Sequence, residues 1–226
     1  MKTTATILTL AVTALSSAGA SFAGEVSGAS RGRRPTIILR MIKDADVDER
    51  ALLKAEKEAA AILDRSGIAL VSLTCEAGRA VWTSGNPCQR ERGAAEFWFH
   101  VVTRKPSRAT TEMLGFTELD ESTGSTSAGV FYSTAVELSD RYRCDVFQIL
   151  GAAIAHEIGH LLLGANAHAP KGLMVPQWGP SQFEMISISE LSFTSRQARL
   201  LREEVTRRTL AAGPKHSDHS SREDRL

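Results

Sequence analysis

The hydrophobic positions of this chain follow the period of a strand in some segments and the period of a helix in others. Residues 36–42 and 68–73 are short apolar runs, which is typical of buried strands. Between them, residues 48–65 carry an apolar stripe at helical spacing, with Asp48 as a possible cap and Gly67 at the end. A strand, a helix and a strand in this order predict a βαβ unit with parallel strands.

The middle of the chain is expected to add further strands. Residues 96–104 place large apolar side chains at every second position, and residues 113–119 predict a weaker strand at the edge of the sheet. Residues 128–138 are expected to form one more strand. The segments 75–93 and 120–127 are rich in turn-forming residues, so we expect them to be loops.

Two more helices are predicted in the second half. Residues 145–163 are apolar on nearly every side, which indicates a helix in the core rather than at the surface. Asp145 can cap this helix. Residues 194–197 have the pattern of a capping box, and the helix that it opens is expected to run to about residue 210.

The predicted core helix contains the sequence His156-Glu157-Ile158-Gly159-His160. Histidines four apart project from one face of a helix, so both imidazoles can hold a single zinc ion. Glu157 can reach a metal-bound water without being a ligand and can take its proton. Burying these three polar side chains in an apolar helix without a metal would be costly, which favours a zinc site over two histidines satisfied in the core.

The first 23 residues predict a secretory signal peptide. Lys2 precedes an apolar run at residues 7–15, and small residues lead to a cleavage site after Ala23, with Ala20 as the alternative. The apolar run is too short to span a bilayer. We therefore expect a secreted or periplasmic protein without a membrane span.

After cleavage, residues 35–212 are expected to form one catalytic domain. Residues 24–34 would be a flexible basic lead, and residues 213–226 a disordered polar tail. Of the 27 basic and 26 acidic residues, only Lys2 lies in the signal segment, so the mature chain carries equal numbers of both. This balance indicates neither a nucleic-acid partner nor an anionic membrane surface, and we expect a monomer.

Cys75, Cys88 and Cys144 are an odd number of cysteines for an oxidising compartment. Cys75 and Cys88 bracket a loop and are the expected disulfide, which would leave Cys144 free. Three pairings are possible from the sequence.

The order of these elements, the H-E-x-x-H helix, Gly164, a third histidine at His168 and a turn containing Met174 together resemble the metzincin zinc endopeptidases. Residues 172–176 are similar to the matrixin form of the Met turn, and the resemblance covers residues 36–210. It implies an α+β fold: a twisted, mostly parallel sheet of four or five strands with an antiparallel edge strand, two helices packed on it and a C-terminal helix. A peptide or protein substrate would pair with the edge strand near residues 114–119.

The resemblance further implies that His156, His160 and His168 are zinc ligands. Glu157 would be the general base, and Met174 would lie beneath the metal. Gly164 would be the structural glycine between the second and third histidines.

One departure concerns the spacing, because the metzincin pattern has two residues on each side of the glycine and this chain has three. The usual third-ligand position is therefore Asn166, whose neutral amide is a poor zinc ligand. We assign the third site to His168 on a longer return loop. Glu184 or Glu190 as a downstream third ligand is a weaker alternative.

Two functions remain open at this point. The first is a secreted zinc endopeptidase that hydrolyses peptide bonds, with Glu157 as general base. The second is a non-catalytic, zinc-stabilised binding module, in which a fourth protein ligand such as Asn166 or Cys144 would complete a structural site. Glu157 favours the enzyme, since a purely structural zinc site has no use for a carboxylate there.

Overall fold

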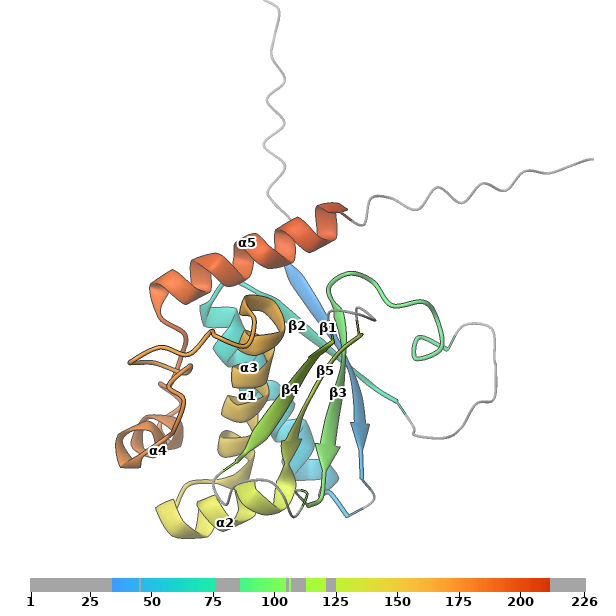
Figure 1. The fold of residues 1–226 in the computed structure, drawn as a ribbon. Coiled ribbons are helices and arrows are strands. Elements are labelled where there is room, and N and C mark those ends of the chain that lie inside the picture. Colours follow the sequence, from blue (N-terminus) through green and yellow to red (C-terminus); the bar gives the residue numbers. More distant parts are fainter. Residues whose placement is uncertain are drawn as a thin grey trace, which may run out of the picture. The chain divides into compact units, whose positions relative to one another are not determined.

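The computed structural model describes residues 34–44, 46–75, 86–104, 106, 113–120 and 125–211. The predicted signal peptide and polar tail, and all but Arg34 of the basic lead, lie outside these residues. Within them the elements shown in Figure 1 are, in chain order, β1 (Thr36–Lys43), α1 (Glu49–Arg65), β2 (Ala69–Thr74), β3 (Glu96–Val102), β4 (Gly115–Asp120), β5 (Ser125–Phe131), α2 (Tyr132–Tyr142), α3 (Val146–Leu163), α4 (Pro180–Ser187) and α5 (Ser195–Ala211).

The strands form a five-stranded sheet in the order β2-β1-β3-β5-β4. β1 is parallel to both β2 and β3, and β3 is parallel to β5. β4 is antiparallel to β5 and forms the last strand in this order. The predicted α+β fold, with a mostly parallel sheet and an antiparallel edge strand, is therefore confirmed.

Helices α1 and α3 pack against each other and against the sheet (Figure 1). The core between them contains alternate residues of the central strands, as the period of two requires. These side chains are at most 1% exposed: Ile37, Leu39, Met41, Phe97, Phe99, Val101, Ala128 and Val130. The apolar alternation in the sequence thus marks the face of the sheet that the helices cover.

Helix α1 begins and ends as its sequence predicts. The backbone N–H of Ala51 donates to the carboxylate of Asp48 over 2.7 Å, which satisfies one of the free donors of the first turn. Gly67 adopts a φ of 78° just after the helix, in the left-handed region that glycine enters without strain.

The predicted strand at residues 128–138 is wrong in its second half, because the chain turns into helix α2 at Tyr132. Apolar side chains recur at Ala135, Leu138 and Tyr142, which is the spacing of one helix face. The aromatic and β-branched residues at the start of this segment masked that period. Conversely, β5 begins at Ser125, inside the predicted loop, because it pairs there with β4.

Helix α4 was not predicted from the sequence, and Glu184 lies within it. Pro180 occupies the first helical position, where its missing N–H costs nothing. The side-chain oxygen of Gln182 accepts from the backbone N–H of Gly179 over 2.9 Å. At the start of α5 the predicted capping box is present: Thr194 Oγ1 accepts from the N–H of Gln197, whose side chain accepts from the N–H of Thr194.

Helix α3 is the one helix in the described part of the chain that is long and apolar enough to cross a membrane. Most of it is buried inside the fold, as expected of a core helix. Asp145 precedes the helix as predicted, but its side chain makes no capping hydrogen bond.

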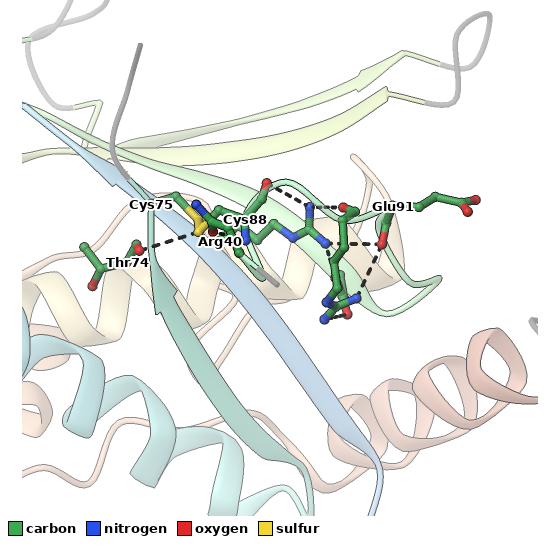
Figure 2. Close-up of a disulfide and its surroundings, with 8 residues drawn as sticks. Arg40, Thr74, Cys75, Cys88 and Glu91 are labelled. Atoms are coloured by element: carbon green, nitrogen blue, oxygen red, sulfur yellow. Dashed lines mark hydrogen bonds and ion pairs between the residues drawn. A yellow bond between two sulfur atoms is a disulfide. The ribbon is translucent and has the colours of Figure 1, made fainter. Parts of the chain in front are cut away.

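The opposite face of the sheet carries a polar cluster next to a disulfide (Figure 2). Cys75 and Cys88 are joined as predicted, and Cys144 is free and buried. The disulfide anchors the loop before β3 beside Arg40, which is only 2% exposed. The guanidinium of Arg40 donates to the backbone carbonyls of Cys88, Arg90 and Glu91.

Arg40 also forms a buried ion pair with Glu96, with 2.7 Å between Nη2 and Oε2. Burial alone would raise the pKa of Glu96. Hydrogen bonds from Arg90, at the backbone of Gly93 and from Arg40 outweigh that effect, so the pKa of this carboxyl lies below its ordinary value. The cluster therefore stabilises the ionised form of Glu96.

We predict that Glu96→Gln lowers the free energy of unfolding by about 3 kcal/mol at pH 7, because it leaves a buried guanidinium without its counter-charge. A carboxyl with a lowered native pKa stabilises fully above its unfolded pKa of about 4.3. That contribution is lost as the pH falls through the native pKa. Urea unfolding of both proteins between pH 3 and 7 would measure the difference, and a difference that does not change with pH would contradict this assignment.

Candidate metal centre

Helix α3 supplies most of the site and is buried continuously from Ile149 to Leu162. It can lie this deep because small residues let other elements approach it. A Cβ at Gly151, for example, would lie 2.8 Å from the carbonyl oxygen of Ala55 in α1. The helix therefore carries His156, Glu157 and His160 into the interior, where each of the three is at most 8% exposed.

Three imidazoles converge on one point. The Nε2 atoms of His156 and His160 are 3.1 Å apart, and those of His160 and His168 are 3.2 Å apart. One ring nitrogen from each of the three lies within 4.8 Å of the others. Among the described histidine, cysteine, aspartate and glutamate residues, these three form the only such group.

Backbone carbonyls fix the orientation of the two buried rings. Nδ1 of His156 lies 2.9 Å from the carbonyl oxygen of Leu173, and Nδ1 of His160 lies 3.2 Å from that of Gly164. A carbonyl can only accept, so each Nδ1 carries a proton and each Nε2 presents a lone pair in the neutral ring. This is the outer-shell arrangement that holds a metal-binding histidine in the required tautomer.

The donor set fits a metal ion. The lone pairs of His156 and His160, which face each other with 3.1 Å between the Nε2 atoms, repel unless a cation lies between them. Two nitrogens bound to a tetrahedral zinc ion at 2.0–2.1 Å would be about 3.3 Å apart. The spacing found here is close to that value, so the three histidines are near enough to bind one metal ion.

The electrostatics keep the imidazoles of His156 and His160 neutral. Burial lowers the pKa of His156 to about 4, and the nearby His160 and His168 add to that effect, while the bond to Leu173 opposes it. Burial also lowers the pKa of His160. Metals bind the neutral imidazole, so both side chains are in the binding form at neutral pH.

His168 reaches the other two rings through the turn that follows α3. The helix ends at Leu163, and Gly164 adopts a φ of 88°, so the chain reverses direction there. The N–H of Ala167 donates to the carbonyl of Gly164, which closes the longer return loop. The structure thus places His168, and not the exposed Asn166, beside the two helical histidines.

The segment around Met174 packs against α3 and contacts His156. Met174 is fully buried, and a Cβ at Gly159 would collide with its sulfur. The carbonyl of Leu173 accepts from the indole N–H of Trp178 over 3.1 Å as well as contacting His156. Met174 therefore packs against α3 at Gly159, and its predicted place beneath a metal stays a prediction.

Glu157 contacts the edge strand. Thr117 Oγ1 lies 2.7 Å from its Oε2, and a Cβ at Gly115 would lie 2.5 Å from its Oε1. Burial raises the pKa of Glu157 to about 7, against the opposing effect of the Thr117 hydrogen bond. Neither partner was predicted from the sequence, because each contact joins positions some 40 residues apart.

The three histidines and Glu157 open into a cleft of about 840 Å³. Its other lining residues come from β4 and the two residues before it, from α2, α3 and α4, and from the turn after Met174: Met113, Leu114, Gly115, Leu138, Arg141, Tyr142, Ala153, Val175, Pro176, Gln177, Trp178 and Phe183. A hollow of about 980 Å³ between α5 and the loop after α3 contains Asn166 and shares only His168 with the cleft. The smaller cleft is the one with the reactive groups, so we take it as the candidate site.

The other sequence candidates lie elsewhere. Cys144 is buried near the start of α3, next to the side chain of Gln148. Glu184 and Glu190 are exposed and do not join the histidines. The downstream glutamate ligand that the sequence left as an alternative is therefore not brought to the site.

Comparison with known proteins adds no identification: no protein-family model matches the chain, and no curated protein is detectably similar to it.

His168→Ala should weaken zinc binding by more than about 100-fold, because losing a ligand should cost more than the 10–100-fold typical of an outer-shell change. Asn166→Ala, two positions earlier, should leave zinc affinity within about twofold. Competition titration with a chromogenic zinc chelator measures both. Equal losses in the two variants would show that the return loop as a whole, and not the imidazole, is what matters.

Proposed function

We propose that this chain is a zinc-dependent endopeptidase in which His156, His160 and His168 bind the metal and Glu157 is the general base. The observation that carries the proposal is the buried carboxylate next to three converging imidazoles, in a cleft large enough for a peptide. The resemblance of the motif and its turn to metzincins supports the same activity.

Zinc is the proposed metal because neutral imidazoles suit it, and three protein ligands are typical of its catalytic sites. A zinc ion held here would acidify a water molecule and polarise the carbonyl of the scissile peptide bond. The binding-module alternative needs a fourth protein ligand, and the described cysteine, aspartate and glutamate residues offer none at this cluster.

Glu157 has the properties of a general base for this reaction. Burial raises the pKa of its carboxyl above the ordinary value, and a carboxylate of this kind can take a proton from the attacking water and return it to the leaving amine. A surface carboxylate with an ordinary pKa would be a weaker base. Burial in α3 therefore supports the proposed role.

An extended peptide is the proposed substrate. β4 pairs with β5 on one side, and no other described strand pairs with its outer side. A peptide can add to such an edge by backbone hydrogen bonds. Gly115 belongs to both β4 and the cleft wall, so a peptide paired with this strand would pass beside Glu157.

A secreted or periplasmic location remains part of the proposal. The Cys75–Cys88 disulfide supports it, because such bonds persist in oxidising compartments. Cleavage of the predicted signal peptide can be read directly from the N-terminus of the exported protein.

Glu157→Ala should keep the zinc and lose hydrolysis by about 10²–10⁴-fold, the usual contribution of a general base. Metal content and cleavage of a mixed peptide library, with and without a chelator, test this. Glu184→Ala, on the exposed face of α4, is the matched control and should keep full activity. An active Glu157→Ala enzyme would exclude the proposed base.

Arg141 predicts that the cleft prefers substrates with acidic side chains. It is the one lysine or arginine among the residues that line it, and the described part of the chain gives it no acidic partner. Peptides with glutamate near the scissile bond should therefore be cleaved faster than matched peptides with lysine. Arg141→Glu should reverse the order, whereas a preference unchanged in this variant would show that Arg141 does not contact substrate.

A further inference from the structure

We propose that Thr117 is a positioning residue that holds the Glu157 carboxylate at the metal centre, and that Gly115 provides the space this requires. The inference rests on the proposed function, since it concerns the general base of that reaction. It adds that the edge strand, which would bind the substrate, also orients the base.

Thr117 binds one oxygen of the carboxylate. Its hydroxyl donates to Oε2 of Glu157 over 2.7 Å and lies 3.4 Å from the main-chain oxygen of the same residue. The shorter bond has the length expected for a hydroxyl and a carboxylate. Oε2 is therefore the carboxylate oxygen that accepts the hydrogen bond from Thr117.

Gly115 confines the other oxygen. A side chain at this position would place its Cβ 2.5 Å from Oε1 and 2.9 Å from Cγ and Cδ of Glu157. Real Cβ atoms do not approach this closely, so the carboxylate fills the volume that the glycine leaves. Gly115 also lines the cleft, so Oε1 lies at the cleft wall.

Residues 115 and 117 lie on the same face of β4, because side chains two apart in a strand point the same way. Together they fix both oxygens: Oε2 accepts from Thr117, and Oε1 is left to take the proton of the attacking water. Without the hydroxyl, the carboxylate can rotate away from this orientation while the histidines keep the metal.

Thr117→Val tests the inference because it removes the hydroxyl and keeps the shape of the side chain. We expect kcat to fall by about 10–100-fold, the effect of losing a hydrogen bond to a charged group, with KM and zinc content within about twofold. Thr117→Ser should restore most of kcat. In a Glu157→Ala background, Thr117→Val should have no further effect.

Thr134→Val is the matched control. Thr134 is 1% exposed, and its hydroxyl has no hydrogen-bond partner among the described residues, so the same exchange should leave kcat unchanged. A kcat of Thr117→Val equal to that of the wild type, or a failure of Thr117→Ser to recover, would overturn the positioning role.

A second readout does not depend on activity. In crystals of the zinc-loaded proteins, we expect the Glu157 carboxylate to keep its position in Thr117→Ser and to rotate in Thr117→Val and in Gly115→Ala. An unmoved carboxylate would overturn the inference. If the wild type cleaves no peptide but the carboxylate still rotates, the proposed peptidase function fails and the positioning contact stands.

Discussion

The candidate site depends on two neutral imidazoles, His156 and His160, that are held close together inside the fold with the exposed His168 beside them. The Nε2 atoms of these two rings are 3.1 Å apart, which is unfavourable for two lone pairs unless a cation lies between them, and backbone carbonyls on the far side of the rings hold them in place. This arrangement requires helix α3 to be buried on nearly every side. It also requires the chain after α3 to come back to the helix at two points, first at His168 and then at Leu173 and Met174.

The Glu157 carboxylate is oriented by a different element from the one that carries it. Glu157 shares the helix with two of the histidines, but its orientation comes from the edge strand, through the hydroxyl of Thr117 and the absence of a side chain at Gly115. One strand therefore has two roles in the proposed enzyme: binding an extended peptide and orienting the base. In this proposal, β4 would contact both the peptide and the Glu157 carboxylate, which α3 carries.

The other face of the sheet has a separate polar cluster. Arg40 is buried there with Glu96, and the loop anchored by the Cys75–Cys88 disulfide supplies the carbonyls that its guanidinium requires (Figure 2). The core side chains of the sheet point the other way, toward α1 and α3. The cluster therefore bears on the stability of the sheet, while the chemistry of the cleft depends on α3 and β4.

The sequence by itself determined the features that depend on neighbouring residues: the helices and strands, their caps, and which side chains share one face of a helix. The parallel β1-α1-β2 unit, the caps at Asp48 and Thr194, and the pairing of His156 with His160 on one helix face are local patterns, and the structure has all of them. The local hydrophobic period gave wrong predictions in two places. Residues 132–138 begin with the pattern of a strand but fold as α2, and α4 is too short for its helical period to be recognised in the sequence.

The tertiary structure decided which residues far apart in the sequence come into contact. The choice between Asn166 and His168 depends on how the chain leaves Gly164, and the contact of Thr117 with Glu157 depends on where β4 lies against α3. Such contacts join residues far apart in sequence, and only the packing of the whole core determines their distance.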